Sequence, residues 1–136
     1  MLDKGVKPEL EVWYTDQLWL LKLTYLIQFV MGFQSGACAT SKGLLHMLDS
    51  APMQSVFFVL GVGSLQAPMI TVGILSGLDV RTGMEDNLYY RRHEPCKDNA
   101  QLVEKVVRIA REPGREIATP KEARQILGLS EKPSQY

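Results

Sequence analysis

The stretch SVFFVLGVGSLQAPMITVGIL, residues 55–75, decides how the fold of this chain is interpreted. Its first part, residues 55–62, is rich in β-branched and aromatic residues and predicts a buried strand. The Gly61-Val62-Gly63 turn follows, and Pro68 lies near the first turn of a helix, where proline is tolerated. That helix is expected to stop at Gly77. A strand, a tight turn and a helix in this order are the repeating unit of α/β folds with parallel sheets.

The same region raises the question of a membrane span, because no charged residue lies between Asp49 and Asp79. A bilayer-spanning helix needs about 20 apolar residues, which this run exceeds. Its middle, however, contains two glycines, polar groups and a proline, and irregular backbone facing lipid would leave peptide groups unpaired. We therefore expect two short buried elements joined by a loop, and no membrane partner.

Similar units are predicted on both sides of this stretch, so the chain alternates strands and helices. Such alternation implies parallel strands with right-handed crossovers, and chemistry at the carboxyl ends of the strands. The fold class is therefore α/β. The predicted strands are residues 6–13, 25–31, 55–62 and 78–82, and the predicted helices are 16–22, one from Thr40 or Ser41, one up to Gly77, one from Asp98 or Asn99, and one from Thr119 with Pro120 at its first position.

Composition limits the classes of partner and compartment. A chain of 136 residues is expected to form one domain, and its 15 basic and 15 acidic residues give no net charge that would favour nucleic acid. Cys38 and Cys96 are far apart and are interpreted as free thiols in a reducing compartment. The first five residues do not resemble a signal peptide, so we expect a cytoplasmic location.

The candidate chemistry lies in VRTGMEDNLY, residues 80–89. Arg81 can bind a carboxylate or phosphate through two parallel hydrogen bonds, Glu85 can ligate a metal, and Asp86 can accept a proton. The alternative is purely structural, with Arg81 in an ion pair and the two carboxylates capping a helix. Asn87 completes this polar group.

Two further groups of residues are candidates for the same site. Glu9 and Glu11 point to one face of a predicted strand, where they are either solvated or inside a polar barrel mouth. The backbone amides at Gly61 and Gly63 can approach a phosphate, although two glycines in such a turn are common for steric reasons alone. His46 and His93 have no metal-ligand spacing and are interpreted as surface or core-edge residues.

Several segments together resemble the C-terminal half of the β-keto acid cleavage enzymes, and the resemblance covers nearly the whole chain. Its most specific part is RTGMEDNLY at residues 81–89, and ATPKEARQILGL at residues 118–129 supports it. The other matching segments are KPELEV at 7–12, QFVMG at 28–32, LLHMLD at 44–49 and VLGVG at 59–63.

The resemblance implies a zinc-dependent (β/α)₈ barrel that combines a β-keto acid with acetyl-CoA and splits the adduct into acetoacetyl-CoA and a second product. It implies that Glu85 ligates Zn²⁺, that Arg81 orients the carboxylate of the keto acid, and that Asp86 assists proton transfer. Glu11, or less directly Glu9, would line the site. By the same resemblance Asn87, Gly61 and Gly63 would contact substrate.

Four departures define what this chain lacks. A (β/α)₈ barrel needs about 250 residues, and the histidine pair His-x-His that supplies the family's other zinc ligands is absent. Ser64 stands where the family has an arginine, and the crossover between Thr15 and Tyr25 is short. We therefore expect residues 1–129 to form the C-terminal four βα units of a barrel, followed by a polar tail at 130–136.

This fragment is expected to be inactive alone and to self-associate or pair with a missing N-terminal half. The alternative is a non-catalytic remnant that binds a full-length subunit.

Overall fold

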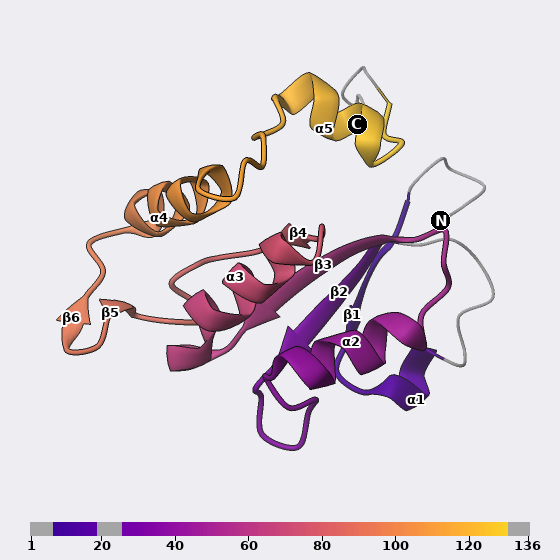
Figure 1. The fold of residues 1–136 in the computed structure, drawn as a ribbon, viewed down its shortest axis with the longest axis horizontal. Helices are drawn as coiled ribbons and strands as arrows, with labels where there is room; N and C mark the ends of the chain where they lie inside the picture. The colour runs from indigo at the N-terminus through magenta and orange to yellow at the C-terminus, as the bar shows by residue number, and fades with distance from the viewer. Residues whose placement is uncertain (1–6, 19–25, 131–136) are drawn as a thin grey trace, which may run out of the picture.

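A computed structural model describes residues 7–18 and 26–130 of the chain. The parts of three predicted elements that fall on residues 6, 19–22 and 25, and nearly all of the polar tail, lie outside these ranges. Figure 1 shows the described elements in chain order. They are β1 (Glu9–Val12), α1 (Thr15–Leu18), β2 (Leu26–Met31), α2 (Ser41–Asp49), β3 (Val56–Gly61), a 3₁₀ turn (Gly63–Leu65), α3 (Gln66–Leu75), β4 (Asp79–Val80), β5 (Tyr89–Arg91), β6 (Glu94–Pro95), α4 (Asn99–Arg111) and α5 (Pro120–Ile126).

The four predicted strands form one parallel sheet, in the order β1-β2-β3-β4. Every pairing in the sheet is parallel, as the alternating pattern predicts. The register aligns Glu11 with Gln28, Gln28 with Phe58, and Phe58 with Asp79. These four residues therefore lie in one row on the same face of the sheet. The mixed α/β class and the parallel sheet are confirmed.

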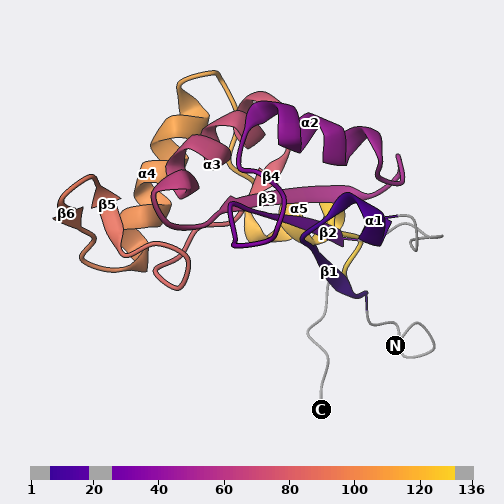
Figure 2. The ribbon, with the colours of Figure 1, turned by 90° about the horizontal axis from the view of Figure 1, so that it is seen from below.

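The opposite face of the sheet carries the hydrophobic core. Ile27, Phe29 and Val59 are fully buried there and pack with Leu44 and Met47 of α2 and Met69 of α3. Figure 2 shows α2 and α3 together on this side of the sheet, with α5 on the other side. α4 packs on α3 through a second, smaller cluster that includes Ile70, Ile74 and Ala110. One face of the sheet is thus covered by α2 and α3, while the other carries the row of Glu11, Gln28, Phe58 and Asp79 next to buried apolar residues such as Val30 and Leu60.

The helix boundaries follow the predicted capping signals closely. Thr40 caps α2 by accepting a hydrogen bond from the Gly43 amide, and Asp98 caps α4 in the same way. Thr119 and Glu122 form the predicted capping box at the start of α5. In α2, Leu44 and Met47 are buried while Leu45 is half exposed, because the helical period places Leu44 and Met47 on the same face.

Residues 91–94 lie in a two-stranded antiparallel sheet, β5 with β6, whose exposed turn holds His93 at a φ of 64°. Both cysteines are free thiols, Cys38 exposed and Cys96 buried. No described helix has the length and apolar character required to cross a bilayer.

Asp79 lies on the face of the sheet opposite the core, and its carboxyl is expected to make the stability of the protein depend on pH. Burial raises the pKa of its carboxyl, and the Arg115 guanidinium opposes the effect. A folded-state pKa above the unfolded value means that ionising Asp79 costs native stability, so stability falls as pH rises from about 3.9 through the raised pKa. We expect Asp79→Asn to increase the free energy of unfolding at neutral pH, and to have no such effect near about pH 3. Urea unfolding at the two pH values measures this, and a less stable variant at neutral pH would contradict it.

Candidate functional site

Arg81 lies at the centre of the candidate site, directly after β4. Its guanidinium donates to Glu11 at 3.1 Å, pairs with Glu85, and lies 3.7 Å from Asp86. Its backbone amide donates to the Val59 carbonyl at 3.1 Å, which extends the sheet by one residue and fixes where the side chain starts. The structure therefore brings together three of the carboxylates that the sequence singled out, around the one arginine.

Glu11 reaches this cluster because it occupies the carboxyl end of β1. Gln28, at the same level of β2, donates a side-chain hydrogen bond of 3.2 Å to the Glu11 carboxylate. Gln28 is only 1% exposed, and a buried amide of this kind needs such a partner. Glu9 points to the same face but lies one row lower and is exposed. Of the two glutamates, Glu11 is the one placed beside Arg81, and Gln28 is a member of the cluster that sequence reasoning did not identify.

Asp86 is the least exposed carboxylate of the cluster. Its side chain is 15% exposed, against 47% for Glu11 and 67% for Glu85. One of its oxygens, Oδ2, is buried without a hydrogen-bond partner. This burial raises the pKa of Asp86 above the usual range, opposed by the charge of Arg81 and reinforced by that of Glu11. A carboxyl group in this environment can hold a proton more readily than an exposed aspartate.

The segment that carries Arg81 to Asn87 is held in place by side chains from α3 and α4. Gln66, 2% exposed at the start of α3, donates to the Gly83 carbonyl at 3.0 Å and accepts from the Thr82 hydroxyl at 3.1 Å. Asn99, the first residue of α4, accepts a hydrogen bond of 2.8 Å from the Met84 amide. The predicted site is therefore positioned by two amide side chains that lie outside its own motif.

The Gly61-Val62-Gly63 turn supports this segment from the other side. The Gly63 amide donates to the Asp86 carbonyl at 2.7 Å, and Gly63 has a φ of +62°. A Cβ atom at Gly61 would lie 2.4 Å from the Leu65 carbonyl oxygen. The close approach of the Leu65 carbonyl therefore explains why residue 61 is a glycine. The Gly63 amide already has a hydrogen-bond acceptor within the protein.

A cleft of about 460 Å³ opens between this turn and the 84–89 segment, and its lining includes Ser64, Glu85, Asp86 and Asn87. The Asn87 side chain donates to the Tyr89 carbonyl at 2.7 Å and accepts from the Tyr89 amide at 3.2 Å. Asn87 thereby shapes the turn that leads from the carboxylates into β5. The cleft places Glu85 and Asp86 where a small molecule can reach them.

The residues of this cleft do not by themselves fit a zinc ion. Catalytic zinc takes three protein ligands, and within residues 7–18 and 26–130 no group of three His, Cys, Asp or Glu side chains could hold a metal. His46 and His93 are both exposed, in α2 and in the β5–β6 turn. Glu85 is paired with Arg81, so the described part of the chain offers at most one piece of a metal site.

Comparison with known proteins gives the chain a family. Residues 1–129 match the sequence model of the β-keto acid cleavage enzymes. The chain is 42% identical to the 3-keto-5-aminohexanoate cleavage enzyme of Acetoanaerobium sticklandii, over 96% of this chain and 51% of that enzyme. It is 43% identical to the enzyme of the same name from Fusobacterium nucleatum, over 95% of this chain and 50% of the relative. A 3-dehydrocarnitine:acetyl-CoA trimethylamine transferase of Rhizobium meliloti is 33% identical, over 97% of this chain and 47% of the transferase.

The chain thus spans about half the length of the curated relatives it matches.

Proposed function

The chain belongs to the β-keto acid cleavage enzyme family, and from that premise we propose that it supplies one part of an acetyl-CoA-dependent enzyme that cleaves a β-keto acid. The observation that carries the proposal is the cluster around Arg81. An arginine with Glu11, Glu85 and Asp86 at the carboxyl ends of parallel strands lies where α/β enzymes place their chemistry.

Within this function the residues have distinct roles. Arg81 binds the carboxylate of the keto acid, in exchange for one of its present carboxylate partners. Asp86, with its buried oxygen, moves the proton next to the keto group. Glu11 and Gln28 hold the Arg81 guanidinium in position, and Glu9, Asn87, Gly61 and Gly63 shape the surface around the substrate.

The sheet is proposed to be part of a (β/α)₈ barrel completed by a second segment. Two features support this: the strands follow one another in chain order, and one face is covered by α2 and α3 while the other carries the row of Glu11, Gln28, Phe58 and Asp79. Among the described strands, β1 and β4 are the two edges, and an exposed edge is a template for pairing with another strand. The partner would be the missing half, or a second copy of the chain.

Zinc is proposed to bind only in the completed enzyme. There Glu85 would add one carboxylate to the two histidines that the family resemblance implies for the other half, and the ion would serve as a Lewis acid. The chain alone is proposed to be inactive. The two free thiols support a reducing, cytoplasmic setting.

Reconstitution tests this function. The chain is expressed alone, and together with the part of the Acetoanaerobium sticklandii enzyme that it does not match. We expect no consumption of 3-keto-5-aminohexanoate and acetyl-CoA by the chain alone. The pair is expected to co-elute, to bind stoichiometric zinc and to consume both substrates.

Turnover by the chain alone would rule out the partial-site proposal. A pair that co-elutes and binds zinc without turnover would instead favour the non-catalytic alternative, in which the chain contributes only an interface.

A further inference from the structure

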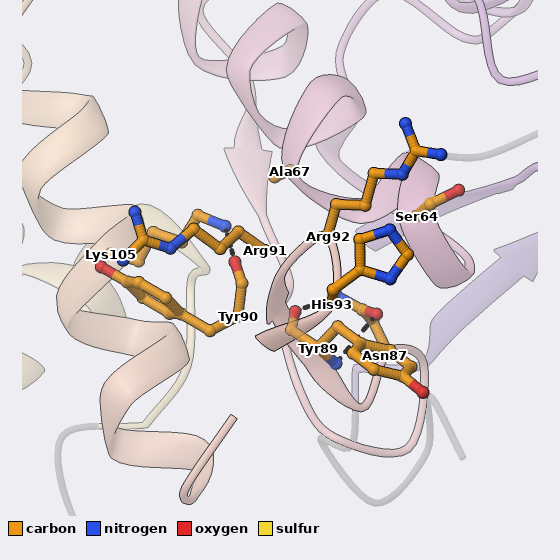
Figure 3. A pocket seen from close by; sticks show the side chains of 9 residues that line it. All are labelled: Ser64, Ala67, Asn87, Tyr89, Tyr90, Arg91, Arg92, His93 and Lys105. Atoms are coloured by element: carbon orange, nitrogen blue, oxygen red, sulfur yellow. Dashed lines mark hydrogen bonds between the residues drawn. The ribbon is translucent and has the colours of Figure 1, made fainter. Parts of the chain in front are cut away.

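A second pocket, of about 500 Å³, lies between the β5–β6 hairpin and α4 (Figure 3). We call it the hairpin pocket. Arg91, Arg92 and His93 reach it from the hairpin, and Lys105 reaches it from α4. Its volume falls in the range of small-molecule sites, which is about 300–1,000 Å³. None of the residues around Arg81 that form the candidate site, apart from Asn87, lines it.

The hairpin pocket is strongly positively charged. Its described lining contains three permanently charged basic side chains and no carboxylate. Arg91 pairs with Glu94 across the turn, while Arg92 and Lys105 have no ion-pair partner among the described residues. Because the whole chain has no net charge, this local excess of positive charge is a feature of the pocket itself. It favours an anionic ligand.

Tyr90 holds the basic groups of one wall in a fixed arrangement. Lys105 donates to the Tyr90 carbonyl, and its ammonium lies 4.9 Å from the centre of the Tyr90 ring. Arg108 donates to the Tyr90 hydroxyl at 3.2 Å, and the Arg91 guanidinium lies 5.9 Å from the ring centre. Cations positioned by a carbonyl and an aromatic face keep their charge unneutralised, so they remain available to an anion.

The hairpin pocket continues into the cleft that contains the carboxylates. Ser64, Asn87 and Tyr89 line both. In Figure 3, Asn87 and Tyr89 lie together below His93. Tyr89 is 52% exposed and offers an aromatic face at this junction. A ligand extending from one pocket to the other would carry phosphate groups at one end and a reacting group beside Asp86 at the other.

We propose that the hairpin pocket binds the phosphate groups of the acetyl-CoA co-substrate, with the acyl end in the cleft beside Asp86. This inference rests on the proposed function for the identity of the ligand. Arg92 and Lys105 contact the phosphates, as charge-assisted donors do, and Tyr89, at the junction of the two pockets, packs against the pantetheine arm that joins the phosphates to the acyl end.

Calorimetric titration of the purified chain with coenzyme A, 3′-dephospho-coenzyme A and pantetheine tests the proposal without requiring catalysis. Coenzyme A is expected to bind most tightly, pantetheine most weakly, and added salt to weaken only the phosphorylated ligands. Arg92→Gln is expected to weaken coenzyme A binding about 10-fold or more. Arg111→Gln removes the same charge from α4 outside the pocket and is expected to change affinity by less than about twofold.

Three results would overturn the inference: equal affinity for pantetheine and coenzyme A, an Arg92→Gln variant that binds as the wild type does, or inorganic pyrophosphate that binds as tightly as coenzyme A. The measurement is independent of the reconstitution assay. Phosphate-dependent binding to the chain with an inactive pair would sink the proposed function alone, whereas an active pair whose KM for acetyl-CoA is unchanged by Arg92→Gln would sink this inference alone.

Discussion

Replacing Asp86 by asparagine is expected to lower the kcat of the reconstituted enzyme by about 10²- to 10⁴-fold, the usual contribution of a positioned acid or base. Asparagine keeps the shape of the side chain and loses its ability to take up and release a proton. The reason to expect the effect at this residue is that Asp86 lines the cleft, while its Oδ2 is buried 3.7 Å from the Arg81 guanidinium without a hydrogen-bond partner. Initial rates at saturating substrate measure the change.

The matched control for Asp86→Asn is Asp79→Asn. It makes the same substitution in β4, two residues before Arg81 and in the same row of the sheet as Glu11. It is expected to leave kcat within about twofold, because surface and partly exposed charges outside the site contribute little. Equal losses in the two variants would mean that Asp86 acts through the charge of this face and not through proton transfer.

Replacing Phe29 by alanine is expected to remove about 3–5 kcal/mol of stability. Phe29 is fully buried in the middle of β2, and its ring stacks on that of Phe57 at 5.6 Å with an angle of 12° between the planes. The total stability of a domain is about 5–15 kcal/mol, so the variant is expected to be largely or partly unfolded. Urea unfolding followed by circular dichroism measures the loss.

Phe33→Ala is the control for this loss. Phe33 is 52% exposed and contacts the Trp13 ring edge-on at 4.8 Å. An exposed aromatic pair contributes about 0.5–1.5 kcal/mol, so this variant should stay folded. A loss below about 1 kcal/mol for Phe29→Ala would contradict the assignment of the core to this face of the sheet.

The elements predicted most closely from sequence are those with signals in the local chain. Thr119, Pro120 and Glu122 specify the start of α5 through hydrogen bonds that span three residues, and the structure has the same capping box. Strands buried on both faces, such as β2, are recognisable because nearly every residue is apolar. The parallel pairing of the strands followed from their alternation with helices.

The β5–β6 hairpin was not predicted because its sequence has no alternation of apolar and polar residues. It has only three and two residues in its strands, charged groups in its turn, and a non-glycine residue at positive φ. It is held by contacts distant in sequence, including the bond from Lys105 to Tyr90. Gln66 and Gln28 were missed for a related reason: a glutamine in an apolar run gives no sign of which backbone group or carboxylate it will contact.

The order β1-β2-β3-β4 also affects how the chain can fold and where its gene can be divided. Each strand pairs only with its neighbours along the chain, so no pairing within the described sheet closes a loop around another strand. Assembly can proceed stepwise as the chain leaves the ribosome, since each strand pairs with the one synthesised just before it and the entropy of closing a crossover rises only slowly with its length. A gene interrupted between two such units leaves each product with its own strand pairings intact.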